Sequence, residues 1–113
     1  MKSKILALSK NEEFKNLLKK NKLSNKYMTI FFGNLDHKDN KKLNISFVTK
    51  KKIGNAVKRN KIKRRLRNII NDAVKQIPIK FNYSYLVIAK PTMLNSEYTN
   101  IKETLFQSFK QIK

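Results

Sequence analysis

A helical periodicity in the middle of the chain constrains the fold more than any other feature. Between Ile62 and Ile77, apolar residues recur at intervals of three and four, which places them on one face of a long amphipathic α-helix. Pro78 ends this pattern because proline cannot continue a helix. The positions of the apolar face are Ile62, Leu66, Ile69, Ile70, Ala73, Val74 and Ile77.

Strand patterns lie on both sides of this helix. Residues 27–32 are rich in aromatic and β-branched side chains, and residues 43–49 alternate in a mostly half-buried pattern. Residues 83–89 form a continuous apolar run, which is typical of a buried strand. Residues 33–42 are polar and are expected to connect the first two strands. We expect Phe47 and Tyr85 in the core.

Two shorter helices are predicted at the ends of the chain. A capping box at residues 9–12 opens the first, which carries Phe14, Leu17 and Leu18 on one face and ends near residues 20–22. The second begins near residue 95 or 96 and includes Phe109 as a core residue. The order is therefore α-β-β-α-β-α, and one more short strand is compatible with it. This order predicts one α+β domain, residues 1–113, with a small sheet covered by helices.

The charge of the chain points to a polyanionic partner. Lys and Arg number 27 against 7 Asp and Glu, so the net charge is +20, and nucleic acid is favoured over an anionic membrane. The chain has no cysteine, which excludes disulfides and thiolate chemistry. No apolar run reaches the roughly 18–20 residues of a membrane span, and no signal peptide is evident. A cytoplasmic protein without a membrane partner is the expectation.

The positive charge is concentrated just before and within the start of the long helix. Residues 50–67 contain ten cations and no acid. Like charges four residues apart, as in Lys61 and Arg65, destabilise an isolated helix by about 0.2–0.5 kcal/mol per pair. Cations near the positive end of the helix dipole are also disfavoured. A phosphate backbone would relieve both costs, so we predict that this stretch contacts RNA or DNA rather than forming a merely solvated face.

The same stretch resembles the signature of the bacterial ribonuclease P protein family. That signature, K-x-G-x-A-V-x-R-N-x-x-K-R-x-[IL]-R, is filled at every specified position between residues 52 and 67. The resemblance extends over residues 11–14, 85–91 and the closing helix. It implies an αβββαβα domain of the ribosomal protein S5 domain 2-like type, with a four-stranded sheet and a left-handed βαβ crossover. Pattern reading alone favours the common right-handed connection.

The resemblance also implies two RNA-binding surfaces and a function. One surface binds the catalytic ribonuclease P RNA, and a second, formed by the first helix and the sheet, holds the 5′ leader of precursor tRNA. The family acts in endonucleolytic removal of that leader, with no further protein partner required. The expected leader-binding residues are Phe14, Tyr27 and Phe31. The expected residues for the RNA subunit are Lys51, Lys52, Lys58, Arg59, Asn60, Lys61, Lys63, Arg64, Arg65 and Arg67.

Three positions depart from the family pattern. Ser46 stands where many relatives have Gly, and Lys50 stands where many have Ser. Leu18 occupies a position that is often aromatic in the family, so one stacking contact with the leader is not expected in this chain. Phe14 can both pack in the core and border the cleft, and the faces of Tyr27 and Phe31 depend on the strand register.

The sequence does not supply the residues of a protein nuclease. The single histidine, His37, lies in a polar loop, and Glu12 and Glu13 diverge on a helix by about 100°. Asp36 and Asp39 have no further acid placed to join them in a metal site. We therefore expect no catalytic residue, metal or cofactor on the protein itself, with Mg²⁺ held mainly by RNA. The alternatives are a ribosomal or RNA-chaperone protein, a nucleoid DNA-binding protein and a conventional nuclease.

Overall fold

The computed structural model describes the backbone of residues 5–6, 11–34 and 43–112, and the side chains of residues 15–34 and 43–112. The helices are α1 (Asn11–Leu18), α2 (Ala56–Gln76) and α3 (Tyr98–Gln111). The strands are β1 (Ile5–Leu6), β2 (Asn21–Ser24), β3 (Met28–Gly33), β4 (Leu43–Val48) and β5 (Ser84–Ala89). Two 3₁₀ helices, η1 (Lys51–Ile53) and η2 (Pro91–Asn95), precede α2 and α3. The predicted capping-box residue Ser9 lies outside the described residues.

The strands form one mixed sheet in the order β1-β4-β5-β3-β2. Strand β3 pairs antiparallel with β2 on one side and with β5 on the other. Strand β4 is parallel to both β5 and β1. The predicted αβββαβα order is confirmed, with β2 to β5 as its four strands. The two-residue β1 extends the sheet at the β4 edge.

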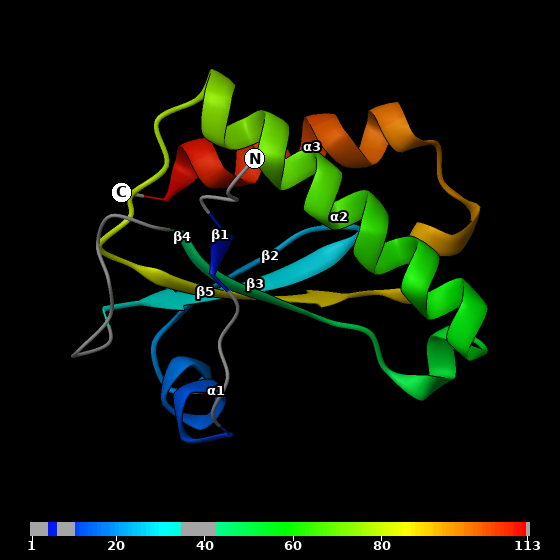
Figure 1. Ribbon diagram of the computed structural model, residues 1–113, viewed down its shortest axis with the longest axis horizontal. Helices are drawn as coiled ribbons and strands as arrows, with labels where there is room; N and C mark the ends of the chain where they lie inside the picture. The colour runs from blue at the N-terminus through cyan, green and yellow to red at the C-terminus, as the bar shows by residue number, and fades with distance from the viewer. Residues whose placement is uncertain (1–4, 7–10, 35–42, 113) are drawn as a thin grey trace.

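The connection from β4 through α2 to β5 has the rarer hand. Both strands run in the same direction, β4 lies nearer the viewer than β5, and α2 returns above the sheet (Figure 1). This arrangement is a left-handed crossover, as the family resemblance implies and contrary to the right-handed connection that pattern reading favours.

Helices cover the sheet on both sides. Figure 1 shows α2 and α3 on one face and α1 on the other. The larger core lies under α2 and α3, where the apolar face of α2 meets alternate residues of β3, β4 and β5. The predicted core positions Tyr85 and Phe109 are buried there, and Phe47 is half-buried against them. The buried residues of α2 are Ile62, Leu66, Ile69, Ile70 and Ala73.

Three helix boundaries and one strand differ from the sequence-based expectation. Helix α1 ends at Leu18 rather than near residues 20–22, because the chain enters β2 at Asn21. Helix α2 begins at Ala56, six residues before its first buried residue, Ile62, because the residues of its opening turns, Val57 included, remain accessible to solvent. Helix α3 begins at Tyr98 because η2 occupies the preceding residues. Strand β4 is not half-buried: Asn44 and Ser46 are buried as well, since this central strand is covered on both faces.

A side-chain clamp fixes the turn between β2 and β3. The Asn25 Oδ1 atom accepts hydrogen bonds from the backbone N–H groups of Tyr27 and Met28, at 2.8 and 2.9 Å. The Asn25 Nδ2 atom donates to Ser108 Oγ of α3 at 2.9 Å. Lys90 Nζ donates to Asn25 O at 2.6 Å. One asparagine thus joins the β2–β3 turn to the last helix.

We expect Asn25→Ala to lower the free energy of unfolding by about 1–3 kcal/mol, because buried polar groups lose their partners. Chemical denaturation in sulfate buffer, which screens the net charge of +20, measures this loss. Asn82→Ala, an exposed asparagine in the turn before β5, is the control. Equal stability of the two variants would contradict the clamp.

Candidate nucleic-acid interface

The entry into α2 is built by three adjacent features of the chain. Ile53 of η1 is buried and anchors the segment to the core. Gly54 has a φ of 153°, a conformation that favours glycine. Asn55 then caps α2, because its side chain accepts a hydrogen bond from the Lys58 N–H at 3.0 Å. These three features hold the basic residues on both sides of Gly54 on one continuous segment.

None of the ten residues predicted to bind the RNA subunit is buried. Seven are exposed and three, Arg59, Lys63 and Arg65, are half-buried. The opposite side of the same helix, with Ile62 and Leu66, is buried against the sheet. The structure therefore leaves the predicted residues accessible along η1 and the first half of α2. Their contact with RNA stays a prediction. The seven exposed residues are Lys51, Lys52, Lys58, Asn60, Lys61, Arg64 and Arg67.

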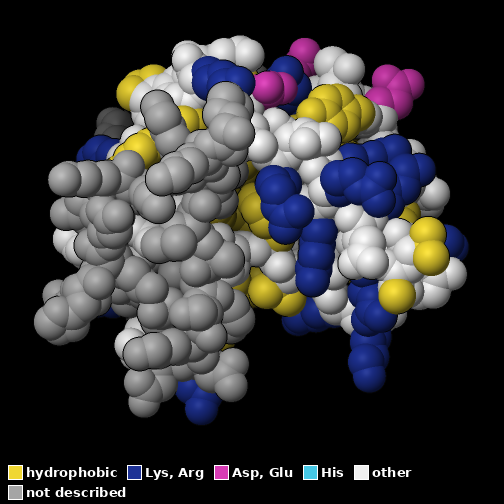
Figure 2. All heavy atoms as spheres, in the orientation of Figure 1, with side chains coloured by type: hydrophobic (Ala, Val, Ile, Leu, Met, Phe, Trp, Pro, Cys, Tyr) yellow, Lys and Arg dark blue, Asp and Glu magenta, His cyan; other side chains and the backbone are white. Residues whose placement is uncertain are grey.

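Acidic side chains are separated from this surface. Within residues 15–34 and 43–112 the acids are Asp72, Glu97 and Glu103, all on the second half of α2 or at α3. Figure 2 shows them along the upper edge of the molecule, with Lys and Arg side chains spread below. The ion pair of these residues joins Lys102 Nζ to Asp72 Oδ2 at 3.1 Å. The cations of η1 and early α2 therefore have no described carboxylate to neutralise them.

A second surface lies between α1 and the opposite face of the sheet. Leu17 of α1 packs on Leu86 of β5, and both are buried. Phe31, Val48 and Ile88 surround this pair and are only half-buried. The strand register places Phe31, Leu86 and Ser46 in one row across β3, β5 and β4. The result is a partly exposed apolar floor beside α1.

The structure places the predicted leader-binding residues in different surroundings. Phe31 lies on the α1 side of the sheet and is half-buried. The backbone of Phe14 lies in α1, but its side chain is outside the described residues. Leu18 of the same helix is 49% exposed. Val48 and Ile88, which belong to the same floor, were not identified from the sequence. Each lies two residues after Ser46 or Leu86 in its strand, and residues two apart share a face of the sheet.

The prediction for Tyr27 is wrong. Its side chain is only 6% exposed and belongs to the core on the α2 and α3 side, so a base cannot stack on it. Strand β3 begins one residue later, at Met28, and Tyr27 sits in the turn that Asn25 clamps. The alternation that groups Tyr27 with Phe31 therefore does not extend to this residue.

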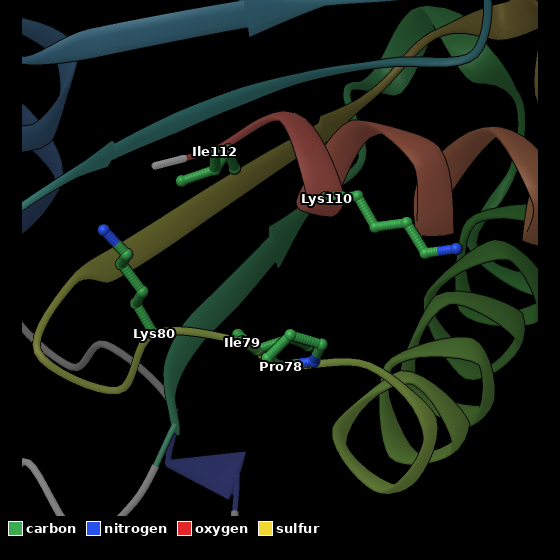
Figure 3. Close-up of a pocket in the computed structure, with 5 residues that line it drawn as sticks. All are labelled: Pro78, Ile79, Lys80, Lys110 and Ile112. Atoms are coloured by element: carbon green, nitrogen blue, oxygen red, sulfur yellow. The ribbon is translucent and has the colours of Figure 1, made fainter.

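A cavity of about 340 Å³ opens near the end of α3. Pro78, Ile79 and Ile112 give it an apolar lining, and Lys80 and Lys110 stand at its rim. Figure 3 shows these two lysine side chains extending in different directions, so their ammonium groups do not converge on one anion. No acid–base pair lines this cavity.

The described residues do not form a hydrolytic centre. Within them, no three His, Asp or Glu side chains lie close enough to hold a metal ion. Burial, with a smaller contribution from Tyr83, raises the pKa of the Tyr85 phenol above its ordinary value. Its hydroxyl donates to Lys80 O at 2.7 Å inside the core, which is a structural role. His37, Asp36 and Asp39 lie outside the described residues. No described helix is long and apolar enough to cross a membrane.

These observations define a class: a small, strongly basic α+β domain with a left-handed crossover and a cationic helix exposed for a polyanion. The family model of Ribonuclease P matches residues 3–113. The ribonuclease P protein component of Carboxydothermus hydrogenoformans is 34% identical over 110 residues, covering 94% of this chain and 90% of that protein. The chain therefore belongs to the ribonuclease P protein family.

Solved structures agree with this assignment. The ribonuclease P protein of Staphylococcus aureus is 27% identical with a TM-score of 0.80, covering 95% of this chain and 94% of that one. The Thermotoga maritima protein, at 24% identity, also has a TM-score of 0.80 and covers 96% and 98% of the two chains. At that identity the second comparison shows the fold alone.

Proposed function

We propose that this chain is the RNA-binding protein subunit of ribonuclease P and that it assists a catalytic RNA in removing the 5′ leader from precursor tRNA. The observation that carries the proposal is the pair of separate surfaces. One is the cationic segment of η1 and α2, which has no described acid beside it. The other is the half-buried apolar floor around Phe31, on the α1 side of the sheet.

Each surface suits a different RNA. Lys and Arg side chains that neutralise phosphates release counterions and bind RNA regardless of sequence, which suits a large structured RNA subunit. An aromatic ring on a sheet stacks with any base, which suits leaders of varied sequence. Bases of a single strand are available for such stacking, whereas those of an A-form helix are not.

We assign the chemistry to the RNA subunit and to Mg²⁺ that the RNA holds, as the resemblance of the chain to the ribonuclease P protein family implies. The protein would reduce the repulsion between two RNAs and hold the leader in place. Less Mg²⁺ would then be needed for assembly and cleavage. Such a subunit acts in the cytoplasm, where precursor tRNA is made.

The test of leader binding is Phe31→Ala in the assembled holoenzyme. We expect its affinity for precursor tRNA to fall by about 1–3 kcal/mol, the contribution of one stacked base. Affinity for mature tRNA, which has no leader, should barely change. Phe14→Ala, predicted from sequence to line the same surface, is expected to behave in the same way. Binding of both tRNAs is measured with each variant.

The control is Phe106→Ala, which removes another half-buried ring, on α3 and away from the α1 side. Thermal melts of all three variants separate stacking from packing, because truncating a core Phe costs about 3–5 kcal/mol of stability. Equal losses for precursor and mature tRNA, together with a large fall in melting temperature, would contradict leader binding by Phe31.

A ribosomal or RNA-chaperone protein shares the charge but would not distinguish a precursor from a mature tRNA. The same pair of affinities therefore separates the two functions.

A further inference from the structure

A small hollow lies where the cationic face of α2 meets η2. Lys58, Lys61 and Arg65 line it from α2, and Leu94 and Asn95 line it from η2. The buried Ile62 completes its lining. Only Lys58, Lys61 and Arg65 belong to the basic residues predicted from sequence, so the hollow adds a second element, η2, to the cationic surface.

The α2 wall is one stripe of the helix. Residues 58, 61, 62 and 65 are spaced by three and four, so they share a face. Lys58 is also held in place: a Cβ atom on Gly54 would lie 2.9 Å from Lys58 Cδ, so the lysine stem packs across the glycine. The glycine of the family signature therefore leaves room for this lysine beside the hollow.

The η2 wall is hydrogen-bonded to the turn between β2 and β3. Thr92 Oγ1 donates to Lys26 O at 2.6 Å, and Ser96 Oγ donates to Thr92 O at 2.7 Å. Met93, which follows Thr92 in η2, is buried in the core. Leu94 is half-buried and Asn95 is exposed. These contacts hold the Asn95 backbone in a fixed position opposite the cations.

The polar groups of the hollow are unused within the described part of the chain. The Asn95 amide makes no hydrogen bond there, and Lys58, Lys61 and Arg65 pair with no described carboxylate. Three cations, one free amide and an apolar floor match the parts of a nucleotide: phosphates, a base edge and a base face. An amide carries a donor next to an acceptor, and so do the edges of nucleobases.

The size of the hollow restricts what enters it. Its volume of about 190 Å³ is below the roughly 300–1,000 Å³ of sites for drug-sized ligands. One base ring system would fit inside, while the flanking phosphates would remain at the rim with the cations. Such a base must be unpaired, since the bases of an A-form helix are stacked and paired, whereas those of loops and bulges can be splayed out into a hollow.

We propose that this hollow binds one unpaired nucleotide of the RNA subunit. The base lies on the half-buried Leu94, the Asn95 amide hydrogen-bonds its edge, and Lys58, Lys61 and Arg65 contact the adjacent phosphates. The proposal rests on the proposed function, because it names how that RNA is recognised. It gives the protein a base-specific contact within an otherwise electrostatic interface.

The absence of cysteine from the chain allows a direct test. Asn95→Cys introduces a single thiol, which carries a photoactivatable crosslinker into the complex with ribonuclease P RNA. We expect a crosslink to one unpaired nucleotide. Asn100→Cys, at an exposed position of α3 outside the hollow, is the matched control and should not label that nucleotide.

Affinity measurements complete the test. Asn95→Ala should weaken binding to the RNA by about tenfold, as loss of one base-edge contact does. With an RNA that is abasic at the crosslinked nucleotide, the same variant should lose about twofold or less, because the two changes remove one interaction. The salt dependence should be unchanged for Asn95→Ala and flattened by about one unit for Arg65→Ala.

Three outcomes would contradict the binding of an unpaired nucleotide in this hollow. They are crosslinks scattered over the RNA, a crosslink to paired nucleotides, and equal losses of affinity with the intact and abasic RNAs. The proposed function would stand in each of these cases, because the wild-type protein would still bind the RNA. If the wild-type protein had no affinity for ribonuclease P RNA, the proposed function would fail, and the assignment of the pocket with it.

Discussion

Protein that is rigorously free of RNA is expected to leave precursor tRNA uncut, whatever the concentration of Mg²⁺. General acid–base hydrolysis needs groups that titrate near neutrality at hydrogen-bond distance from the substrate. Metal-assisted hydrolysis needs converging carboxylates, and the described residues offer no such cluster. The protein together with the RNA subunit is expected to release mature 5′ ends, which gel analysis of end-labelled precursor detects.

The controls are the RNA subunit alone, at low and at raised Mg²⁺. We expect it to cleave only at raised Mg²⁺, because the ions must then supply the neutralisation that the cations of η1 and α2 would provide. Adding the protein should restore cleavage at low Mg²⁺. Site-specific cleavage by the protein alone would show that this chain is itself the nuclease, and would refute the assignment of chemistry to RNA.

Removal of two adjacent cations, Arg64→Ala with Arg65→Ala, is expected to weaken binding to the RNA subunit by about 50-fold at roughly 0.1 M salt. The reason is counterion release: each phosphate contact contributes about 0.9 to the slope of log affinity against log salt concentration. The slope should therefore fall by nearly two units. Titrations of labelled RNA at several salt concentrations measure both quantities.

Lys75→Ala with Lys110→Ala is the matched control. It removes the same charge from exposed positions, at the end of α2 and on α3, away from the predicted surface. If both double variants change the slope equally, the RNA responds only to the net charge of +20, and the cationic segment is not a specific contact surface.

The sequence alone determined those parts of the protein that depend on local spacing. The three- and four-residue intervals from Ile62 to Ile77 predict α2 and its buried face, because only a helix brings these positions together. The apolar run ending at Ala89 predicts β5. The acid-free run of cations from residue 50 to 67 predicts the exposed basic segment, since charges without partners remain in solvent.

The first residues of elements were less predictable, because residues that are not buried carry little periodic information. The first turns of α2 contain no buried residue before Ile62, and the cap at Asn55 is recognised only from its hydrogen bond to the Lys58 N–H. Strand β2 is largely exposed, so its four residues have no strand pattern of their own and form by pairing with β3.

Tertiary structure alone decided which side chains share a surface. Tyr27 is buried because the Asn25 clamp turns the chain just before β3. Phe31 meets Leu86 because β3 pairs with β5, more than fifty residues later in the chain. Asn95 lines the same hollow as Lys61 and Arg65 because η2 packs beside α2. Spacing along a chain specifies the faces of single elements, whereas contacts between elements depend on strand order and crossover hand, which local sequence does not encode.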